Sequence, residues 1–587
     1  MFLLFLITFF LFSINPVKAL DEFNSQQNLT YQLDNQGNAI VTQEIQLTNN
    51  LSEIYPTVYQ LNLYGPQITN VKGNDSVGNI VQKVDRTGDS NLINLKFNEA
   101  NLGKDKITKF ILTYNISNLA IQKGNIWELS LPDYQNLKDT DIININIYVP
   151  STYGSLSFSS NSPKNIIPLN NQTQIYFENI KNKKTLLIFG NYQLFDFNFK
   201  YFLQNNETSS KTLEIPLPPE NDSQQIIFKE INPIPQNIKI DQDGNWLAQY
   251  KLAANQELEI SVSGQAKIIS ADIKQKINIK DYLKPQTYWP VDDPSIEQLK
   301  FSNAKEIYNY VVNTLNYDYE SINSATRKGA LQALLLPNSS LCTEFTDLFV
   351  TLARANGIPA REIEGFAYTN NSKIKPINTN ADILHAWPQY YDQNQKAWVS
   401  IDPTWGKTTN GVDFFNDLDP NHFAFVFHGL DSQNPLPPGA YKNSHNIKTV
   451  QVEFATQELQ SEYQNLKITP INNNFYQNQE IKITNPNYQS LKKLNISINS
   501  INWHQTIDQL PPLSSITLKI PNLSFLKSIN PKNQKLELSI SSQNSYSQKV
   551  SLKNNQYFFD LCIFLALIST LVGIGGIIFT NNRKSKK

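Results

Sequence analysis

The sequence predicts a multidomain, membrane-anchored chain with an N-terminal β-sandwich region, a central α+β domain, a C-terminal β-sandwich and one C-terminal transmembrane helix. Three observations predict this fold class. The 587 residues are too many for one compact domain. Period-two alternation of apolar residues fills the flanks, whereas helical periodicity is concentrated in the middle. An uncharged apolar run of membrane length lies near the C-terminus.

The composition limits the classes of function. Hydrophobic residues make up 40% and aromatic residues 11% of the chain, which is enough to bury several cores. Lys and Arg number 50 against 51 Asp and Glu, so the formal charge is −1 and no basic surplus exists for a phosphate backbone. We therefore expect no nucleic-acid partner. Of the two cysteines, Cys342 and Cys562, the second lies in the apolar C-terminal run, which excludes a disulfide scaffold.

The two ends of the chain predict export and anchoring. Residues 2–14 form an apolar run that is short for a bilayer span, and small residues follow it, so residues 1–19 are predicted to be a cleaved signal peptide. An uncleaved anchor is the alternative. Residues 561–579 carry no charge and are long enough to cross about 30 Å of hydrocarbon. The basic residues after this run predict a cytoplasmic C-terminus and an ectodomain outside the cell membrane.

The elements between the ends follow from periodicity and from turn residues. Short alternating runs over residues 28–195 predict an antiparallel β-sandwich. Asp293 and Pro294 form an N-cap and N1 pair that opens a helical stretch reaching to about residue 316. A second helix is predicted from about Cys342 to Asn356, because its apolar residues recur at the spacing of a buried stripe.

The predicted segments are a signal peptide at 1–19, a β-sandwich at 20–195, a small β unit or an extension of that sandwich at 196–267, the central α+β domain at 280–430, a Pro-rich linker at 431–446, a β-sandwich stalk at 447–555, a transmembrane helix at 558–580 and a basic cytoplasmic tail at 581–587.

Cys342 is a candidate nucleophile because it lies at the amino end of the second predicted helix, with Ser339 or Ser340 available as the N-cap. Unpaired N–H groups and the helix dipole favour negative charge at that end, which promotes ionisation of a thiol. A nucleophilic thiol needs a base, and the chain has only five histidines. His385 is the candidate base because it opens a predicted β-hairpin.

The hairpin also supplies a candidate carboxylate. A loop at residues 392–395 pairs Tyr391 with Lys396 and, counting outward, His385 with Asp402. Opposed side chains lie about 4.5–5.5 Å apart, so Asp402 can accept from one imidazole nitrogen and leave the other for the thiol. Cys342, His385 and Asp402 are therefore the predicted catalytic residues, acting as nucleophile, proton shuttle and orienting carboxylate.

These residues lie in motifs that resemble the core of the transglutaminase-like superfamily. The motifs are a helix-borne Cys342, the GIPAR turn at 357–361, the His-Ala-Trp that begins at His385 and the Asp-Pro-Thr that begins at Asp402. The resemblance implies a papain-like α+β fold for residues 280–430 with Cys342, His385 and Asp402 as its triad. It also implies a protein or peptide substrate whose amide bond is attacked to give a Cys thioester. Both resolution by an amine, which gives a crosslink, and hydrolysis by water stay open.

No cofactor and no metal ion are predicted. His422 and His428 lie in one strand-like segment, and no further ligand at a metal-binding spacing accompanies them. Trp387 and Trp405 are predicted to be core aromatics that pack the hairpin rather than substrate platforms.

Three further charged residues are assigned structural roles. Glu344 and Asp347 are predicted to favour the positive end of the helix that begins at Cys342. Arg361 is predicted to form a structural salt bridge, with a substrate carboxylate as the alternative partner.

Two other functions of the whole chain remain as alternatives to catalysis. The first is an inert surface protein that binds or supports through its β-sandwiches, and the second is an envelope sensor or assembly partner.

Overall fold

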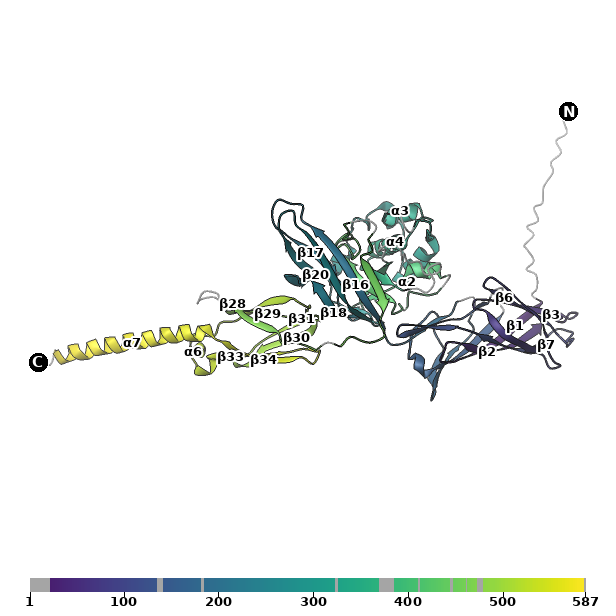
Figure 1. Cartoon of the computed structure of the whole chain (residues 1–587), viewed down its shortest axis with the longest axis horizontal. Coiled ribbons are helices and arrows are strands. Elements are labelled where there is room, and N and C mark those ends of the chain that lie inside the picture. The colour runs from purple at the N-terminus through teal and green to yellow at the C-terminus, as the bar shows by residue number, and fades with distance from the viewer. Residues whose placement is uncertain are drawn as a thin grey trace, which may run out of the picture. The chain divides into compact units, whose positions relative to one another are not determined.

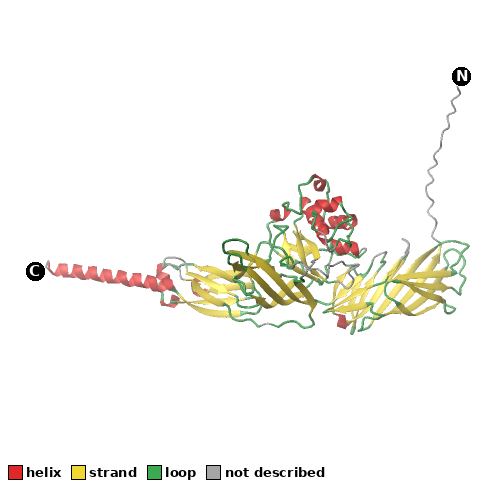
Figure 2. Ribbon diagram, turned by 45° about the horizontal axis from the view of Figure 1, so that its top comes forward, coloured by secondary structure: helices red, strands yellow, loops and turns green. Residues whose placement is uncertain are grey.

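The computed structural model is β-rich, with an α+β region around residues 290–410 and one long apolar helix at the C-terminal end (Figure 1, Figure 2). At this level of detail the predicted fold class is confirmed. The chain divides into two compact units, Met1–Gly190 and Asn191–Lys587. The predicted signal peptide lies outside the described residues. The structure describes residues 22–134, 141–180, 184–321, 326–368, 385–409, 412–416, 418–443, 447–460, 462–471 and 479–584.

In its described residues, the first unit has strands and one short turn of 3₁₀ helix as its regular elements. Its strands are β1 (Phe23–Leu33), β2 (Ala39–Asn49), β3 (Val58–Tyr64), β4 (Ile68–Asn74), β5 (Val81–Thr87), β6 (Ser90–Lys96), β7 (Ile107–Ile116), β8 (Ala120–Lys123), β9 (Ile126–Ser130), β10 (Asp133–Tyr134), β11 (Ile142–Pro150), β12 (Leu156–Ser159), β13 (Asn165–Pro168), β14 (Gln172–Phe177) and β15 (Leu186–Phe189).

These strands form sheets in the orders β13-β14-β11-β1-β2-β7-β4, β10-β3-β6-β5 and β12-β15-β9-β8. In β1 the predicted alternation is present: Leu29, Tyr31 and Leu33 are buried and the residues between them face outward. β1 pairs with β2 in the antiparallel sense but with β11 in the parallel sense, so the expectation of a purely antiparallel sandwich is wrong at that pair.

The second unit begins with two facing sheets, β18-β21-β16-β27 and β17-β20-β19. β16 has an aromatic inner face, with Phe195, Phe197, Phe199 and Tyr201 all buried. β27 comes from far along the chain and pairs with β16, so it does not join the C-terminal sheets. The strands are β16 (Gln193–Gln204), β17 (Lys211–Leu217), β18 (Gln224–Asn232), β19 (Asn237–Ile240), β20 (Trp246–Leu252), β21 (Glu257–Ile268) and β27 (Val450–Phe454).

The α+β region lies in the chain between β21 and β27. Its sheet has the order β22-β25-β24-β23-β26, and its helices gather together (red in Figure 2). The elements are β22 (Ile273–Lys274), α1 (Pro294–Glu297), α2 (Ala304–Thr314), α3 (Ala330–Leu335), α4 (Cys342–Ala355), β23 (Ala360–Ala367), β24 (His385–Asp392), β25 (Ala397–Ser400), α5 (Pro403–Thr408) and β26 (His422–His428).

The first predicted helix of this region is in fact two helices. Asp293 caps α1 as expected, since its side chain accepts from the backbone N–H of Ser295. The helix then ends after Glu297, and Asn303 caps α2 by accepting from the N–H of Glu306. Asn303 lies inside the periodic stretch, and its strong N-cap preference is the signal that marks the break.

β26 is an edge strand, and the neighbouring β-sandwich covers part of its free edge with buried amides. The Asn245 side chain donates to the carbonyl of Phe427 at 2.8 Å and accepts from its N–H at 2.7 Å. Gln224 makes the same pair of bonds with Ala424, at 3.0 and 3.1 Å. These bonds satisfy backbone N–H and C=O groups that would lack hydrogen-bond partners on an uncovered edge strand. They also fix the position of β26, which carries His422.

The C-terminal part of the second unit has two more sheets, β28-β29-β32 and β31-β30-β33-β34, followed by α7. Gln556 in the first turn of α7 exchanges two hydrogen bonds with the backbone of Leu523, at 2.7 and 2.8 Å. The elements are β28 (Lys467–Ile471), β29 (Gln479–Thr484), β30 (Leu491–Ile498), β31 (Trp503–Leu510), β32 (Ser515–Ile520), α6 (Phe525–Ser528), β33 (Lys535–Ser541), β34 (Ser547–Lys553) and α7 (Asn555–Lys584).

α7 is long and apolar enough over Asn555–Gly576 to cross a membrane, and most of its surface is exposed. That pattern is typical of a helix that meets lipid rather than a protein core. The predicted tail begins within the last turn of α7, and residues 585–587 lie outside the described residues.

Candidate active site

Cys342 is the first residue of α4, as predicted, and it is 8% exposed. α4 packs on the sheet with a buried stripe that includes Phe345, Leu348 and Leu352. Gly357 ends the helix region with a positive φ of 77°, a conformation that glycine adopts without strain. The stripe therefore fixes the axis of α4, and the amino end of the helix presents the thiol.

The N-cap of α4 is Leu341, so the assignment of Ser339 or Ser340 is wrong. Both serines lie in the turn before the helix, where the hydroxyl of Ser340 donates to the carbonyl of Pro337. In place of a capping hydroxyl, the carboxylate of Glu344 reaches back and accepts from the N–H of Leu341 at 2.9 Å. The Glu344 carboxylate, in the first turn, thus satisfies the N–H of the N-cap residue itself and keeps negative charge at the positive end of the helix.

The hairpin that carries His385 has a different register from the predicted one. β24 and β25 pair Asp392 with Ala397 and Gln389 with Ser400, so the loop is 393–396 rather than 392–395. Two features explain the displacement: the side chain of Asp392 accepts from the N–H groups of residues 394 and 395, and Lys396 adopts a left-handed φ of 54°. The pairing ends at Ser400, so Asp402 is not a strand partner of His385.

Asp402 instead caps α5. Its Oδ1 accepts from the backbone N–H of Trp405 at 2.9 Å, and its own N–H donates to the carbonyl of Phe414. Gly406 lets α5 approach α2 closely, because a Cβ there would lie 2.1 Å from the hydroxyl of Tyr308. The carboxylate is fully buried. The position of the Asp402 carboxylate therefore depends on a helix cap and on helix packing. Counting residue pairs outward from the hairpin loop takes neither into account.

The structure nevertheless brings the three predicted residues together. His385 Nε2 lies 2.9 Å from Asp402 Oδ2, and both side chains are buried. The neighbouring Cys342 thiol raises the pKa of the same imidazole. His385 Nδ1 has no hydrogen-bond partner among the described residues, so the nitrogen opposite the one bonded to Asp402 is left for proton transfer.

The electrostatics of this group favour an imidazolium beside a carboxylate. Burial lowers the pKa of His385, but the charge of Asp402, its hydrogen bond and the interaction with Cys342 raise that pKa to about 9. Burial raises the pKa of Asp402, yet the charges and hydrogen bonds of His385 and His422 hold that pKa well below its usual range. At neutral pH His385 is therefore protonated and Asp402 is ionised.

Aromatic rings fix the plane of His385. Trp405 stacks on its imidazole with ring centroids 5.1 Å apart, and Trp387 stacks at 5.8 Å. Both indoles are almost completely buried, which confirms that they are core aromatics.

His422 is a residue that the sequence reasoning missed at this site. Its Nε2 lies 3.4 Å from Asp402 Oδ2, and its Nδ1 lies 3.1 Å from Asp419 Oδ1. Burial lowers the pKa of His422, and the charges and hydrogen bonds of Asp419 and Asp402 raise it to about 9. The sequence does contain a hint of this contact: His422 follows Asp419 by three residues, and the chain has few histidines.

Tyr317 is a second missed residue. It forms an isolated bridge with Ser340, two residues before Cys342, and its ring contacts Tyr319 at 4.9 Å. Burial and then the charge of Cys342 raise the pKa of Tyr317. Nothing in the sequence pattern pairs these two residues.

The other charged residues have structural roles that differ in part from the predicted ones. Asp347 does not interact with the end of the helix: it accepts from the indole N–H of Trp289 at 2.8 Å and forms an ion pair with Arg327. Arg361 is buried and donates to the Gln389 and Gln275 side chains, at 2.7 and 3.2 Å, and no carboxylate in the described part of the chain pairs with it. Its role is structural, as expected, but amides take the place of the salt bridge.

Among the residues that the structure describes, two clusters have their ligand-type atoms within 4.8 Å of one another, His385–Asp402–His422 and Glu362–Glu364–His428. In the first, hydrogen bonds already join the atoms that a metal ion would need. In the second, Arg327 supplies positive charge, 2.8 Å from Glu362 and 3.5 Å from Glu364. The absence of a metal ion stays a prediction.

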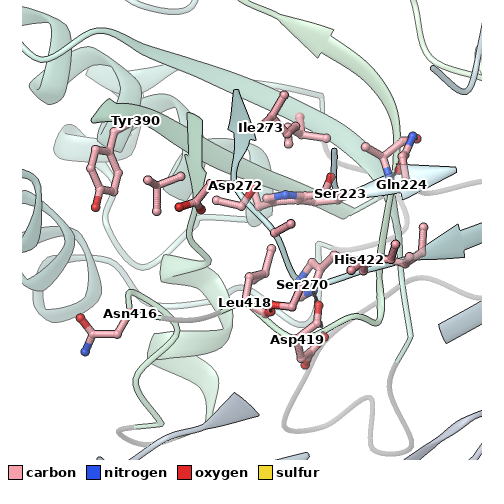
Figure 3. Close-up of a pocket in the computed structure, with 18 of the residues that line it drawn as sticks. Ser223, Gln224, Ser270, Asp272, Ile273, Tyr390, Asn416, Leu418, Asp419 and His422 are labelled. Atoms are coloured by element: carbon pink, nitrogen blue, oxygen red, sulfur yellow. Dashed lines mark hydrogen bonds and ion pairs between the residues drawn. The ribbon is translucent and has the colours of Figure 1, made fainter. Parts of the chain in front are cut away.

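A cavity of about 320 Å³ adjoins the hairpin between the α+β region and the preceding β-sandwich (Figure 3). Figure 3 shows Asp419 and His422 on one side and Tyr390 and Asn416 on the other, with Asp272 near the middle. Cys342 and His385 are not among the residues that line it. The cavity therefore adjoins Asp419 and His422, which lie on the far side of Asp402 from the Cys342 thiol.

With this geometry in view, comparison with known families decides the identity of the central region. The model of the transglutaminase-like superfamily matches residues 290–403, which include Cys342, His385 and Asp402. Residues 290–403 are a transglutaminase-like superfamily domain.

Part of the chain is also similar to curated proteins that are described only as uncharacterized. Uncharacterized proteins of Mycobacterium tuberculosis and Mycobacterium bovis are 27% identical to the chain over 174 residues, which are 29% of this chain and 49% of each relative. The chain thus spans about half the length of the curated relatives it matches.

Solved structures overlap with the chain at low identity. A protein from Cytophaga hutchinsonii, provisionally classed as a cysteine protease, is 14% identical and covers 57% of this chain and 93% of its own, with a TM-score of 0.31. The periplasmic domain of TgpA from Pseudomonas aeruginosa is 14% identical and covers 38% of this chain and 91% of its own, with a TM-score of 0.22.

Proposed function

We propose that the chain is a membrane-tethered thiol enzyme that acts on amide bonds of proteins or peptides outside the cytoplasm. Cys342 is its nucleophile, His385 its acid and base, and Asp402 the carboxylate that orients His385. One observation carries this proposal: a buried imidazole bonded to a buried carboxylate at 2.9 Å interacts with a thiol at the amino end of a helix.

The chemistry follows from these groups. The Cys342 thiolate attacks the carbonyl carbon of an amide, and the oxygen takes up negative charge near the helix end, where the N–H of Cys342 is one donor. As the C–N bond breaks, His385 gives its proton to the departing amine and a thioester remains on Cys342. His385 then takes a proton from the water or amine that attacks the thioester, and the thiolate is released.

The intermediate gives the direct test. We expect a panel of glutamine-containing and other peptides to yield an adduct on the tryptic peptide of Cys342 after acid quenching, because thioesters persist in acid. Hydroxylamine should remove the adduct, and the Cys342→Ala variant should not form it. Intact and peptide mass spectrometry measure both. An adduct at Cys562, or one that resists hydroxylamine, would contradict thioester chemistry at Cys342.

The membrane part of the proposal rests on α7. We propose that α7 crosses the cell membrane once, with the folded units outside and the basic end in the cytoplasm, as the charged residues after residue 582 favour. The bonds between Gln556 and Leu523 then hold the last sheets close to the outer surface of the membrane.

Removal of α7 tests this anchoring. A chain that ends at Asn554 should appear in the soluble fraction, whereas the full chain should stay with membranes after alkaline extraction, because α7 is the one helix in the described residues that is long and apolar enough to span a membrane. External protease should digest the folded units in sealed cells. Ectodomain that is protected from this protease would mean the opposite orientation, and membrane retention of the shortened chain would mean a different anchor.

A further inference from the structure

Asp402 is held by more groups than a two-residue contact with His385 requires. Its Oδ1 accepts from the N–H of Trp405, and its Oδ2 faces two imidazole nitrogens, His385 Nε2 at 2.9 Å and His422 Nε2 at 3.4 Å. Each oxygen of the carboxylate is thus tied to a different element, and Oδ2 is approached from β24 and from β26. This arrangement fixes the plane of the carboxylate as well as its position.

His422 is itself held rigidly. Asp419 faces its Nδ1 at 3.1 Å, and the ring packs against Trp405 and Trp387 with centroids 4.6 and 5.0 Å apart. The strand that carries it is fixed by the amide of Gln224, which pairs with both backbone groups of Ala424. The ring of His422 therefore has one orientation, with Nε2 toward Asp402.

The charges around His422 alternate in sign. The ionisable groups that face it are Asp419, just before β26, and Asp402, at the start of α5, while His385 on β24 lies beyond Asp402. Two carboxylates flanking one imidazole favour its protonated form, which has a donor on each nitrogen. In that form Nε2–H donates to Asp402 and Nδ1–H donates to Asp419.

We propose that His422, held by Asp419, is a positioning residue for the proposed thiol chemistry: its Nε2–H fixes the Asp402 carboxylate in the orientation that directs His385 toward Cys342. This inference rests on the proposed function, because it assigns His422 to the same reaction. In this role His422 acts through Asp402 and not on the thiol itself.

Two variants of one residue separate this role from a merely structural one. In His422→Gln the side-chain amide nitrogen falls near the position of Nε2, so the bond to Asp402 is kept. In His422→Asn the amide nitrogen falls near Nδ1, so the bond to Asp419 is kept and the bond to Asp402 is lost. Both variants remove the ring and its charge, so packing and charge effects are matched between them.

The measurement is the second-order rate of Cys342 alkylation by iodoacetamide at pH 7, followed by intact mass. It uses the full chain in detergent with Cys562→Ser, because Cys562 is exposed. We expect His422→Asn to react about tenfold more slowly than the parent, a loss typical of outer partners that orient a reactive group, and His422→Gln to stay within about threefold. Equal rates for the two variants would overturn the inference.

A third variant keeps the test decisive if either substitution prevents folding. Asp419→Asn preserves the shape of residue 419 but removes its charge, so His422 loses its proton at a lower pH and then turns an unprotonated Nε2 toward Asp402. We expect alkylation to fall more at pH 8 than at pH 6. A pH profile that matches the parent would overturn the inference. A parent thiol that reacts no faster than glutathione would instead contradict the proposed function itself.

Discussion

Replacing His385 by Gln is expected to slow the alkylation of Cys342 at pH 6 by about 100-fold, which corresponds to about 3 kcal/mol. The pKa of His385 is raised to about 9, so the parent imidazole is protonated at pH 6 and stabilises a neighbouring thiolate. Gln carries no charge at any pH and cannot do so. Iodoacetamide reacts with the thiolate, so its rate reports this stabilisation without knowledge of the substrate.

A matched control is available in the same domain. His428 is also buried, its pKa is also raised to about 9, and it pairs with Glu362 at 3.0 Å. His428→Gln therefore removes a comparable buried imidazole from a different cluster and should leave the alkylation rate near that of the parent. If His385→Gln also reacts at the parent rate, no base activates the thiol, and the chain is better described as an inert scaffold.

The sequence predicts which residues form this site better than it predicts the backbone geometry that brings them together. Cys342, His385 and Asp402 were identifiable because a helix start, a strand start and an Asp-Pro pair are local patterns. The contact between His385 and Asp402 was reached through the wrong register. The contact forms because Asp402, which lies beyond the paired part of the hairpin, caps α5 and so brings its carboxylate back toward the sheet.

What the sequence could not give was long-range geometry. The N-cap of α4 is Leu341, whose N–H is satisfied by Glu344, although two serines with a stronger N-cap preference lie just before it. His422 reaches Asp402 only because β26 lies at one edge of the sheet and α5 beside it, and residue types in one strand do not encode that neighbour. The parallel pairing of β1 with β11 likewise joins segments more than 100 residues apart in the chain.

Asp402→Asn is expected to lower the free energy of opening of β24 and α5 by about 3–5 kcal/mol at pH 6, because it leaves two buried imidazolium groups without their shared carboxylate. The effect should shrink as the pH rises. In the folded protein the pKa values of His385 and His422 are raised from 6.5 to about 9. The stabilisation that they contribute is therefore complete below pH 6.5 and is lost as the pH rises through about 9.

Hydrogen exchange of the β24 and α5 amides at pH 6 and pH 9.5, corrected for intrinsic rates, measures this difference locally in a chain of several domains. The loss caused by Asp402→Asn should be larger by several kcal/mol at the lower pH. Asp413→Asn is the control: it removes a partly exposed ion pair with Lys305 at 2.8 Å, so a small loss without a trend from pH 6 to 9.5 is expected. An Asp402→Asn loss that is equal at both pH values would mean that both imidazoles are neutral in the folded protein. In that case Asp402 would act as a hydrogen-bond acceptor and helix cap alone, and the charged pair proposed for catalysis would have to form only when substrate binds.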